Sequence, residues 1–502
     1  MIHLFFLLLC LRFLTAALST AYPQVWPTIV LATGGLSLGY LRPRAALFAF
    51  TVGTALLCGL ADSNLLGCTW PPSIVFSTIW IGNVARLLIY RATRPVEPHS
   101  GAGECTPTTV AICLAELLIT SVLWSLAVQI LRQTHDTEFW PVFWSRAIFG
   151  FGDPYYFVGS AFIWLQGLFY FRLLIRAVSA SAETASPITA WIKPMFFSCT
   201  CVLLISFLIQ STMNIPTTPR SFAGMVLEVS LPYEDSHAFG SIAAAVFAFA
   251  VATWPRIPRT RSLAHAAAAA LLLLLVIASW SRAAWMALVV ALLLLAWRKL
   301  PLLWSAGLTA LIATAILTLG LARKDSWTVD NNPFLYRLGN LLRIDQPRLD
   351  LYHKAFGMVR ERPLLGQGIG ASYRASVRFA QPGDPLAKVP DFMHDFLLQI
   401  TTEQGLFVAS VYAGLFGWVL WRGLRIGFIS SMPAFPEQPA VFGAAVALAT
   451  YLITQLTANS LNVYISNQFF CWFLMAAIFF GTEIRRQQLS AASMEQCSQE
   501  QR

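Results

Sequence analysis

The chain has 502 residues, of which 57% are hydrophobic and only 12% are charged, and its formal net charge is +10. Soluble domains carry about 25% charged residues, so this composition excludes an ordinary soluble protein. Apolar runs near the length of a membrane-spanning helix recur along the chain, whereas the alternating strands of a membrane barrel are missing from it. The sequence therefore predicts an all-α polytopic membrane protein.

We expect fourteen spans, at 3–20, 25–41, 45–61, 72–90, 109–131, 156–178, 194–213, 237–254, 263–279, 283–298, 301–322, 394–421, 439–458 and 465–482. The first has no basic segment before it and runs straight into further spans, so we interpret it as a retained helix. This divides the chain into a helical region at 1–322, a loop at 323–393, a second helical region at 394–482 and a tail at 483–502.

The basic residues predict the orientation of these spans. With the N-terminus inside, eighteen Lys and Arg residues fall in the inner loops, helix ends and tail, against four in the short outer loops. This is the bias of the positive-inside rule, which predicts both termini in the cytoplasm and the loop at 323–393 in the periplasm.

The loop at 323–393 carries eleven further Lys and Arg residues. Long loops escape the charge rule, so this excess can reflect a substrate. Within it, RLDLYHKAFGMVRER predicts an amphipathic helix lying along the membrane, with Leu349, Tyr352, Phe356 and Val359 on one stripe. Pro363 ends that helix, and the following GQGIG predicts a flexible turn. No strand precedes this turn, so it is not a dinucleotide fingerprint.

Three residues stand out on the outer side. His394 opens the helix DFMHDFLLQITTEQG beside Asp395, where an imidazole can act as a general base. Arg282 lies in a very tight outer turn between two long apolar runs, a place where ionisable groups are functional candidates. Arg348 opens the amphipathic helix. The alternatives are a helix-capping histidine, a snorkelling arginine and a solvated helix face.

Other candidates are weaker. Glu234, Asp235 and His237 precede a span, where acids equally serve as ordinary helix caps. Arg360 and Arg362 lie at the end of the amphipathic helix, a position that favours cations without any function. Glu403 lies within the helix that follows His394. Glu116 lies inside an apolar run, where pairing with an arginine of another helix is at least as good a reading as a role in acceptor binding or proton handling.

Three stretches together resemble the O-antigen ligase and polymerase superfamily of bacterial membrane glycosyltransferases. They are SWSRAAWMALVVALLLL at 279–295, RLDLYHKAFGMVRERPLLGQGIG at 348–370 and MHDFLLQITTEQG at 393–405. The segment EDSHAFGSIAA at 234–244 is similar to a polar helix start that many members carry. Members usually have Asn after the histidine, and here the residue is Asp395.

The resemblance implies a GT-C-like bundle of about 12–14 transmembrane helices with a large periplasmic loop. It implies transfer of a glycan from an undecaprenyl-pyrophosphate donor to an acceptor hydroxyl at the periplasmic face of the inner membrane, without metal, nucleotide or other cofactor. The acceptor would be another glycan, lipid A–core or a protein. By the same resemblance, the essential histidine falls on His394 and the essential arginines on Arg282 and Arg348, with Asp395, Glu403, Glu234, Asp235, His237 and Arg360 as supporting candidates.

The chemistry of these residues agrees with that reading. Arginine binds phosphate oxygens in pairs, and histidine can take the proton of an acceptor hydroxyl. No pair of acids suggests a metal, and a single base favours direct, inverting displacement; nothing points to nucleic acid. The other class that fits the composition is a polysaccharide or lipid transporter or flippase. Such proteins show broken helices in matched halves, whereas here the polar features gather in one half.

Overall fold

The computed structural model describes most of the chain. The described residues are 2–20, 25–62, 71–93, 107–146, 149, 153–179, 187–212, 221–222, 225–226, 236–254, 262–321, 346–380, 392–428, 438–457, 461 and 465–500. Glu234 and Asp235, together with residues 322–345 and 381–391 of the predicted loop, lie outside them. Nearly all of the described residues are helical, which confirms the all-α class.

Fourteen long helices of the described chain correspond to the fourteen predicted spans. They are α1 (Ile2–Thr20), α2 (Val25–Leu41), α3 (Pro43–Asp62), α4 (Pro71–Thr93), α5 (Pro107–Gln133), α7 (Tyr156–Ser179), α8 (Pro187–Thr212), α9 (Ser236–Thr253), α10 (Ser262–Ala278), α11 (Arg282–Lys299), α12 (Leu302–Leu321), α16 (Phe396–Phe428), α17 (Gln438–Gln455) and α19 (Ile465–Glu500). By length and composition, seven of them can cross a membrane, and five further described segments are shorter apolar helices. The protein is a multi-pass membrane protein.

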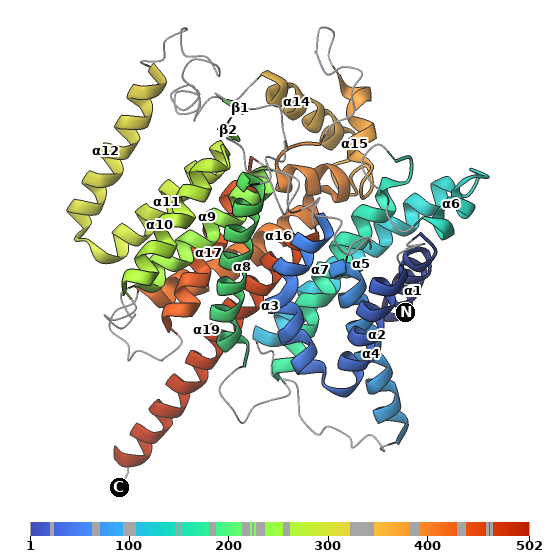
Figure 1. Ribbon diagram of the computed structural model, residues 1–502, viewed down its shortest axis with the longest axis horizontal. Helices are drawn as coiled ribbons and strands as arrows, with labels where there is room; N and C mark the ends of the chain where they lie inside the picture. Colours follow the sequence, from blue (N-terminus) through green and yellow to red (C-terminus); the bar gives the residue numbers. More distant parts are fainter. Residues whose placement is uncertain are drawn as a thin grey trace.

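The remaining elements are short or lie at one end of the bundle. They are α6 (Phe139–Ser145), α14 (Gln346–Glu361), α15 (Ser372–Ala375), the 3-10 helix η3 (Ser376–Phe379), and the two-residue strands β1 (Ser221–Phe222) and β2 (Met225–Val226). β1 and β2 pair antiparallel, with Ser221 opposite Val226. In Figure 1, α14, α15 and the β1–β2 ribbon cap one end of the bundle, and α19 projects from the opposite end. α19 continues as a helix beyond residue 482, where we predicted the tail to begin.

The centre of the bundle is formed by α7, α17 and α19. The apolar stretch Tyr156–Arg176 of α7 is wholly buried, and the stretch Ile465–Glu483 of α19 is 94% buried. α17 is buried along most of its length. In Figure 1 these helices lie between α1, α2 and α4 on the right and α10, α11 and α12 on the left. Polar side chains join the helices inside this apolar core, as is usual in membrane bundles. Gln166 of α7, for example, bonds Ser73 (2.9 Å) and Ser77 (3.1 Å) of α4.

Glu116 of α5 has a structural partner. The Arg172 guanidinium of α7 donates a hydrogen bond to the Glu116 carboxylate, and Arg176 lies 3.9 Å from the same carboxylate. A charge inside a membrane bundle is stabilised by such a pair. This agrees with the structural reading of Glu116 given above and leaves it outside the candidate site.

The predicted amphipathic helix is present as α14 and has two apolar faces. Leu351, Ala355 and Met358 are buried against Ala375 and Met393. The stripe predicted from the sequence points elsewhere, since Leu349 and Phe356 are exposed. One face of α14 therefore anchors the helix to the start of α16, and the other remains open on the surface.

Candidate functional site

The histidine that opens α16 has an unusual backbone. His394 has a φ of 50°, in the left-handed region, a conformation that costs a non-glycine residue roughly 1–2 kcal/mol. The preceding Met393 is fully buried in the α14 cluster, and the following Asp395 caps α16 by accepting a hydrogen bond from Leu398 N (3.0 Å). The sharp turn at His394 thus separates a buried residue from a helix cap. Backbone strain of this kind is typical of functional sites.

Asp395 is the N-cap residue of α16. Asn and Asp cap helices about equally well, so the departure from the family's Asn preserves this interaction. Burial raises the pKa of the Asp395 carboxyl, and the backbone N–H groups of Leu397 and Leu398 oppose that shift. Asp395 directly precedes the apolar span Phe396–Phe428, so it lies at the end of that span.

α14 brings a tyrosine and an arginine to this place. Arg348 and Tyr352 are one helical turn apart, which puts them on the same face of α14. Burial and the Asp395 charge raise the pKa of the Tyr352 phenol, while the Arg348 charge lowers it. Tyr352 therefore lies within the electrostatic reach of both. The structure thus gathers Arg348, Tyr352 and Asp395 beside the His394 turn. Sequence analysis placed Tyr352 on a membrane-facing stripe and missed its position here.

α16 is broken about two and a half turns after its start. Gly405 has φ 86° and ψ 168°, which is not helical. The loop after α14 fills the break and pairs with the freed backbone: Gln367 N donates to Thr402 O (2.7 Å), Gly368 N to Glu403 O (2.9 Å), and Leu406 N to Pro363 O (2.8 Å). Residues 366–370 are buried. The predicted flexible turn is thus a fixed, packed one.

Glu403 belongs to the support of this arrangement. Its side chain is 2% exposed and accepts hydrogen bonds from Ser372 Oγ (2.7 Å) and Gln399 Nε2. Gln399 in turn accepts from Met393 N (3.1 Å). This chain of bonds ties the loop after α14 to the residue that precedes His394. Glu403 is therefore a positioning residue, because it acts through Gln399 on Met393, the residue before the His394 turn.

Arg282 lies in a second strained turn. α10 ends at Ala278 and α11 begins at Arg282, and between them Trp280 has a φ of 52°. Ser281 caps α11 through Ala284 N (3.3 Å), and its hydroxyl lies 3.1 Å from His237 Nδ1 of α9. Trp280 and His394 are the two non-glycine residues with positive φ in the described chain. Both occur in the turns that carry the predicted site residues.

The predicted residues thus form two described groups. One holds His394, Asp395, Arg348 and the positioning residue Glu403, and the other holds Arg282 and His237. Arg360 is exposed in the last turn of α14, at the opposite end of that helix from Arg348. Among the described residues, no three His, Cys, Asp or Glu side chains gather as ligands of a metal ion would.

Four arginines line an open cavity of about 440 Å³, and sequence analysis had considered one of them, Arg362, only as a weak candidate. They are Arg132, Arg362, Arg374 and Arg378, and we call this space the arginine cavity. Arg132 comes from the end of α5, whereas the others follow α14. The one sequence signal was the spacing of Arg374 and Arg378, four residues apart, which places them on one side of a helical turn.

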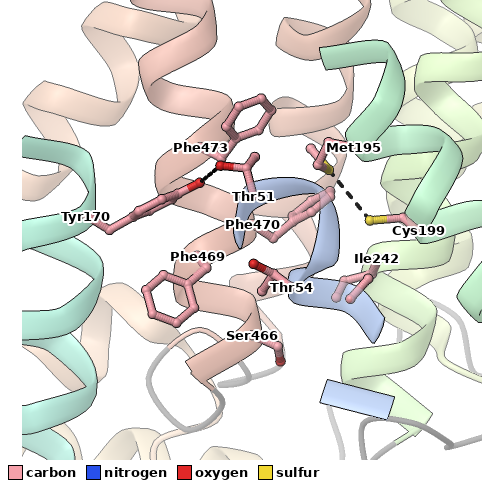
Figure 2. Close-up of a pocket in the computed structure, with 11 residues that line it drawn as sticks. Thr51, Thr54, Tyr170, Met195, Cys199, Ile242, Ser466, Phe469, Phe470 and Phe473 are labelled. Atoms are coloured by element: carbon pink, nitrogen blue, oxygen red, sulfur yellow. Dashed lines mark hydrogen bonds between the residues drawn. The ribbon is translucent and has the colours of Figure 1, made fainter. Parts of the chain in front are cut away.

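An enclosed cavity inside the bundle is too small for a substrate. It lies between α3, α7, α8, α9 and α19, and its volume is about 20 Å³, room for about one water molecule. Figure 2 shows the Thr51 hydroxyl directed at the Tyr170 hydroxyl, 2.6 Å away, within this lining. The cavity is a small packing defect in the core of the bundle.

Part of the chain is similar to a known protein family. Residues 267–413 match the family model described as O-antigen ligase. The chain carries an O-antigen ligase domain. This confirms the resemblance seen in the sequence. The O-antigen ligase domain spans Arg282, Arg348, His394 and the break at Gly405, and it includes α14 and the loop that fills the break. His237 and Arg132 lie before it.

A curated relative is similar to part of the chain. The probable peptidoglycan glycosyltransferase FtsW of Thioalkalivibrio sulfidiphilus (strain HL-EbGR7) is 29% identical over 177 residues. The match covers 34% of this chain and 38% of the relative. The chain therefore spans well under half the length of that protein, and the likeness extends to part of each molecule.

Proposed function

We propose that the protein transfers a glycan from an undecaprenyl-pyrophosphate-linked donor to an acceptor hydroxyl. A membrane glycosyltransferase-type function is supported by the O-antigen ligase domain and by the FtsW relative. The observation that carries the finer proposal is the strained turn at His394, held beside Arg348 and Tyr352 within that domain. The charge bias of the loops supports a site at the periplasmic face of the inner membrane.

In the proposed reaction, the acceptor oxygen attacks the anomeric carbon of the donor sugar. A new carbon–oxygen bond forms as the bond to the pyrophosphate breaks, and the electron pair of that bond leaves with the pyrophosphate. His394 takes the proton of the acceptor hydroxyl as general base. Direct displacement inverts the anomeric configuration, and the activated donor makes ATP unnecessary.

The arginines have the complementary task. Negative charge develops on the leaving pyrophosphate, and guanidinium groups that bind two oxygens at once stabilise it. In this proposal, Arg348 in the first turn of α14 and Arg282 at the start of α11 supply these guanidinium groups. Because each turn is fixed by caps and packing, these donors need little rearrangement during the reaction, which is the condition for efficient electrostatic stabilisation.

The test replaces His394 in cells whose own copy is deleted. Asn tolerates the left-handed conformation better than most residues, so His394→Asn removes the base with little change in backbone strain, and His394→Ala serves as the comparison. Both variants should reach the membrane at parental levels yet lose glycan transfer about a hundredfold or more. Normal transfer by His394→Asn would overturn the proposed base.

The same deletion separates the subclasses. Loss of chain attachment to lipid A–core indicates a ligase, loss of long chains with attachment intact indicates a polymerase, and loss of glycosylated protein indicates a protein O-glycosyltransferase. Retention of intact donor on the cytoplasmic side would instead favour the transporter or flippase class and contradict the proposal.

A further inference from the structure

The arginine cavity continues into a groove of different character. The groove has a volume of about 520 Å³ and shares Arg132 and Arg362 with the arginine cavity. Its remaining lining is largely apolar and comes from α5, α16 and the loop after α14. We call it the apolar groove; its apolar residues are Trp124, Val128, Leu364, Leu365, Phe407 and Val408.

The groove faces outward from membrane-spanning helices. Trp124 is 66% exposed and Phe407 is 59% exposed, and they belong to the candidate spans α5 and α16. Trp124 precedes Arg132 by two helical turns or so, which is about 12 Å along α5. The apolar groove therefore runs from the arginines towards the middle of the predicted membrane, the direction in which a lipid chain would extend.

One buried residue, Gln367, holds two of the four arginines in place. Gln367 is 3% exposed; its backbone oxygen accepts hydrogen bonds from Arg132 Nη1 (3.2 Å) and Gln129 Nε2 (2.8 Å). Its side-chain oxygen accepts from Arg378 Nη2 (3.1 Å). Gln367 is itself fixed by the pairing of the loop with the break in α16. The cavity is thus a built feature of the fold.

The positive charge of the arginine cavity favours an anionic ligand. Glu361 lies 3.9 Å from Arg362 and 3.8 Å from Arg378, so these two guanidinium groups share one carboxylate. Arg374 and Arg378 are four residues apart on one helical turn, an arrangement in which like charges repel. Phosphate oxygens are the partners that clustered arginines bind best.

The arginine cavity is separate from the His394 turn. Arg348 lies in the first turn of α14, whereas Arg362 directly follows the end of that helix. Fourteen residues of helix separate them by about 21 Å, far more than one pyrophosphate group spans. A donor whose pyrophosphate lies at Arg348 leaves the arginine cavity available to another molecule.

We propose that the arginine cavity and the apolar groove together bind a second lipid, whose phosphate lies among the four arginines and whose chain lies along the groove. The ligand is a membrane lipid with a phosphate-bearing headgroup, because the anion site and the apolar channel are continuous. This inference goes beyond the proposed transfer reaction and holds whether or not His394 is its base.

The experiment counts bound lipids by native mass spectrometry of the purified protein in detergent. The probe is dioleoyl phosphatidic acid, with dioleoyl phosphatidylcholine and inorganic pyrophosphate as the two comparison ligands. The parent should bind phosphatidic acid at one saturable site that phosphatidylcholine does not displace. Arg374→Gln with Arg378→Gln should weaken this binding about tenfold or more, because two phosphate-binding forks are removed.

A matched control removes the same charge elsewhere. Arg44→Gln with Arg425→Gln changes two exposed arginines of α3 and α16 that line neither space, and it should bind phosphatidic acid like the parent. If the cavity double variant fails to fold, Arg374→Gln alone should still weaken binding. Equal loss in both double variants would reduce the effect to bulk charge and overturn the proposal.

A variant in the apolar groove distinguishes binding of a lipid from binding of a soluble phosphate. Phe407→Gln changes an exposed side chain and should weaken phosphatidic acid while leaving pyrophosphate binding unchanged. Pyrophosphate that displaces the lipid fully, together with parental lipid binding by Phe407→Gln, would assign the cavity to a soluble anion and contradict the inference. His394→Asn should bind the lipid normally, so failure of the transfer reaction and failure of this site are distinguishable.

Discussion

Replacing Gly405 by alanine tests whether the break in α16 supports the site. Its φ and ψ lie in a region that is essentially restricted to glycine, so a side chain costs about 1–3 kcal/mol there. An added Cβ would also lie 2.0 Å from Leu364 O, so the loop after α14 must move away. Three backbone hydrogen bonds join that loop to α16, each contributing roughly 0.5–1.5 kcal/mol. The total loss of stability is on the order of 2–7 kcal/mol.

The assay is thermal unfolding of the purified protein in detergent, followed by glycan transfer at a temperature where the variant is folded. Gly414→Ala is the control in the same helix, because a Cβ there meets nothing within 4 Å and alanine favours helix by about 1 kcal/mol. We expect Gly405→Ala to lower the midpoint and transfer, and Gly414→Ala to raise the midpoint slightly. A Gly405→Ala protein as stable as Gly414→Ala would refute the role of the break.

Three further results are expected. Arg282→Lys and Arg348→Lys keep the charge but cannot bind two phosphate oxygens at once, so transfer by each purified variant should fall roughly tenfold or more. Parental turnover would mean that these arginines only lie at the membrane interface. Burial raises the pKa of Asp395, so the folded state binds that proton more tightly and loses stability as the pH rises above about 4, the ordinary Asp value. Asp395→Asn keeps the cap and should remove this loss of stability as the pH rises above about 4 in thermal unfolding. An unchanged pH profile would speak against it. In a cysteine-free background, Gly383→Cys should react with an impermeant thiol reagent in intact spheroplasts and Ser490→Cys only after lysis; the reverse pattern would place the site in the cytosol.

Much of the helical framework follows from local sequence. Each predicted span has a helix in the described chain because apolar runs of this length are set by neighbouring residues alone. The tight turn before Arg282 was likewise visible, since three residues separate two apolar runs. The helix around Arg348 followed from its amphipathic pattern and from Pro363.

The interior of the site was beyond such reasoning. We predicted α16 as continuous, because Glu403 and Gly405 occur within an apolar run, and the break depends on a loop that pairs with it from 35 or more residues earlier in the chain. The arginine cavity joins Arg132 to residues more than 200 positions away. Contacts of this range leave no periodic signal, so no pattern in the sequence could assemble them.

The most direct test of the account measures both products of the proposed reaction at once. The purified protein, in proteoliposomes with an undecaprenyl-pyrophosphate-linked glycan and an acceptor, should release one undecaprenyl pyrophosphate for each glycan transferred. His394→Asn should abolish both products together by about a hundredfold or more. Movement of intact donor across the bilayer without cleavage, or undiminished transfer by His394→Asn, would contradict the assignment of the protein as a glycan transferase with His394 as its base.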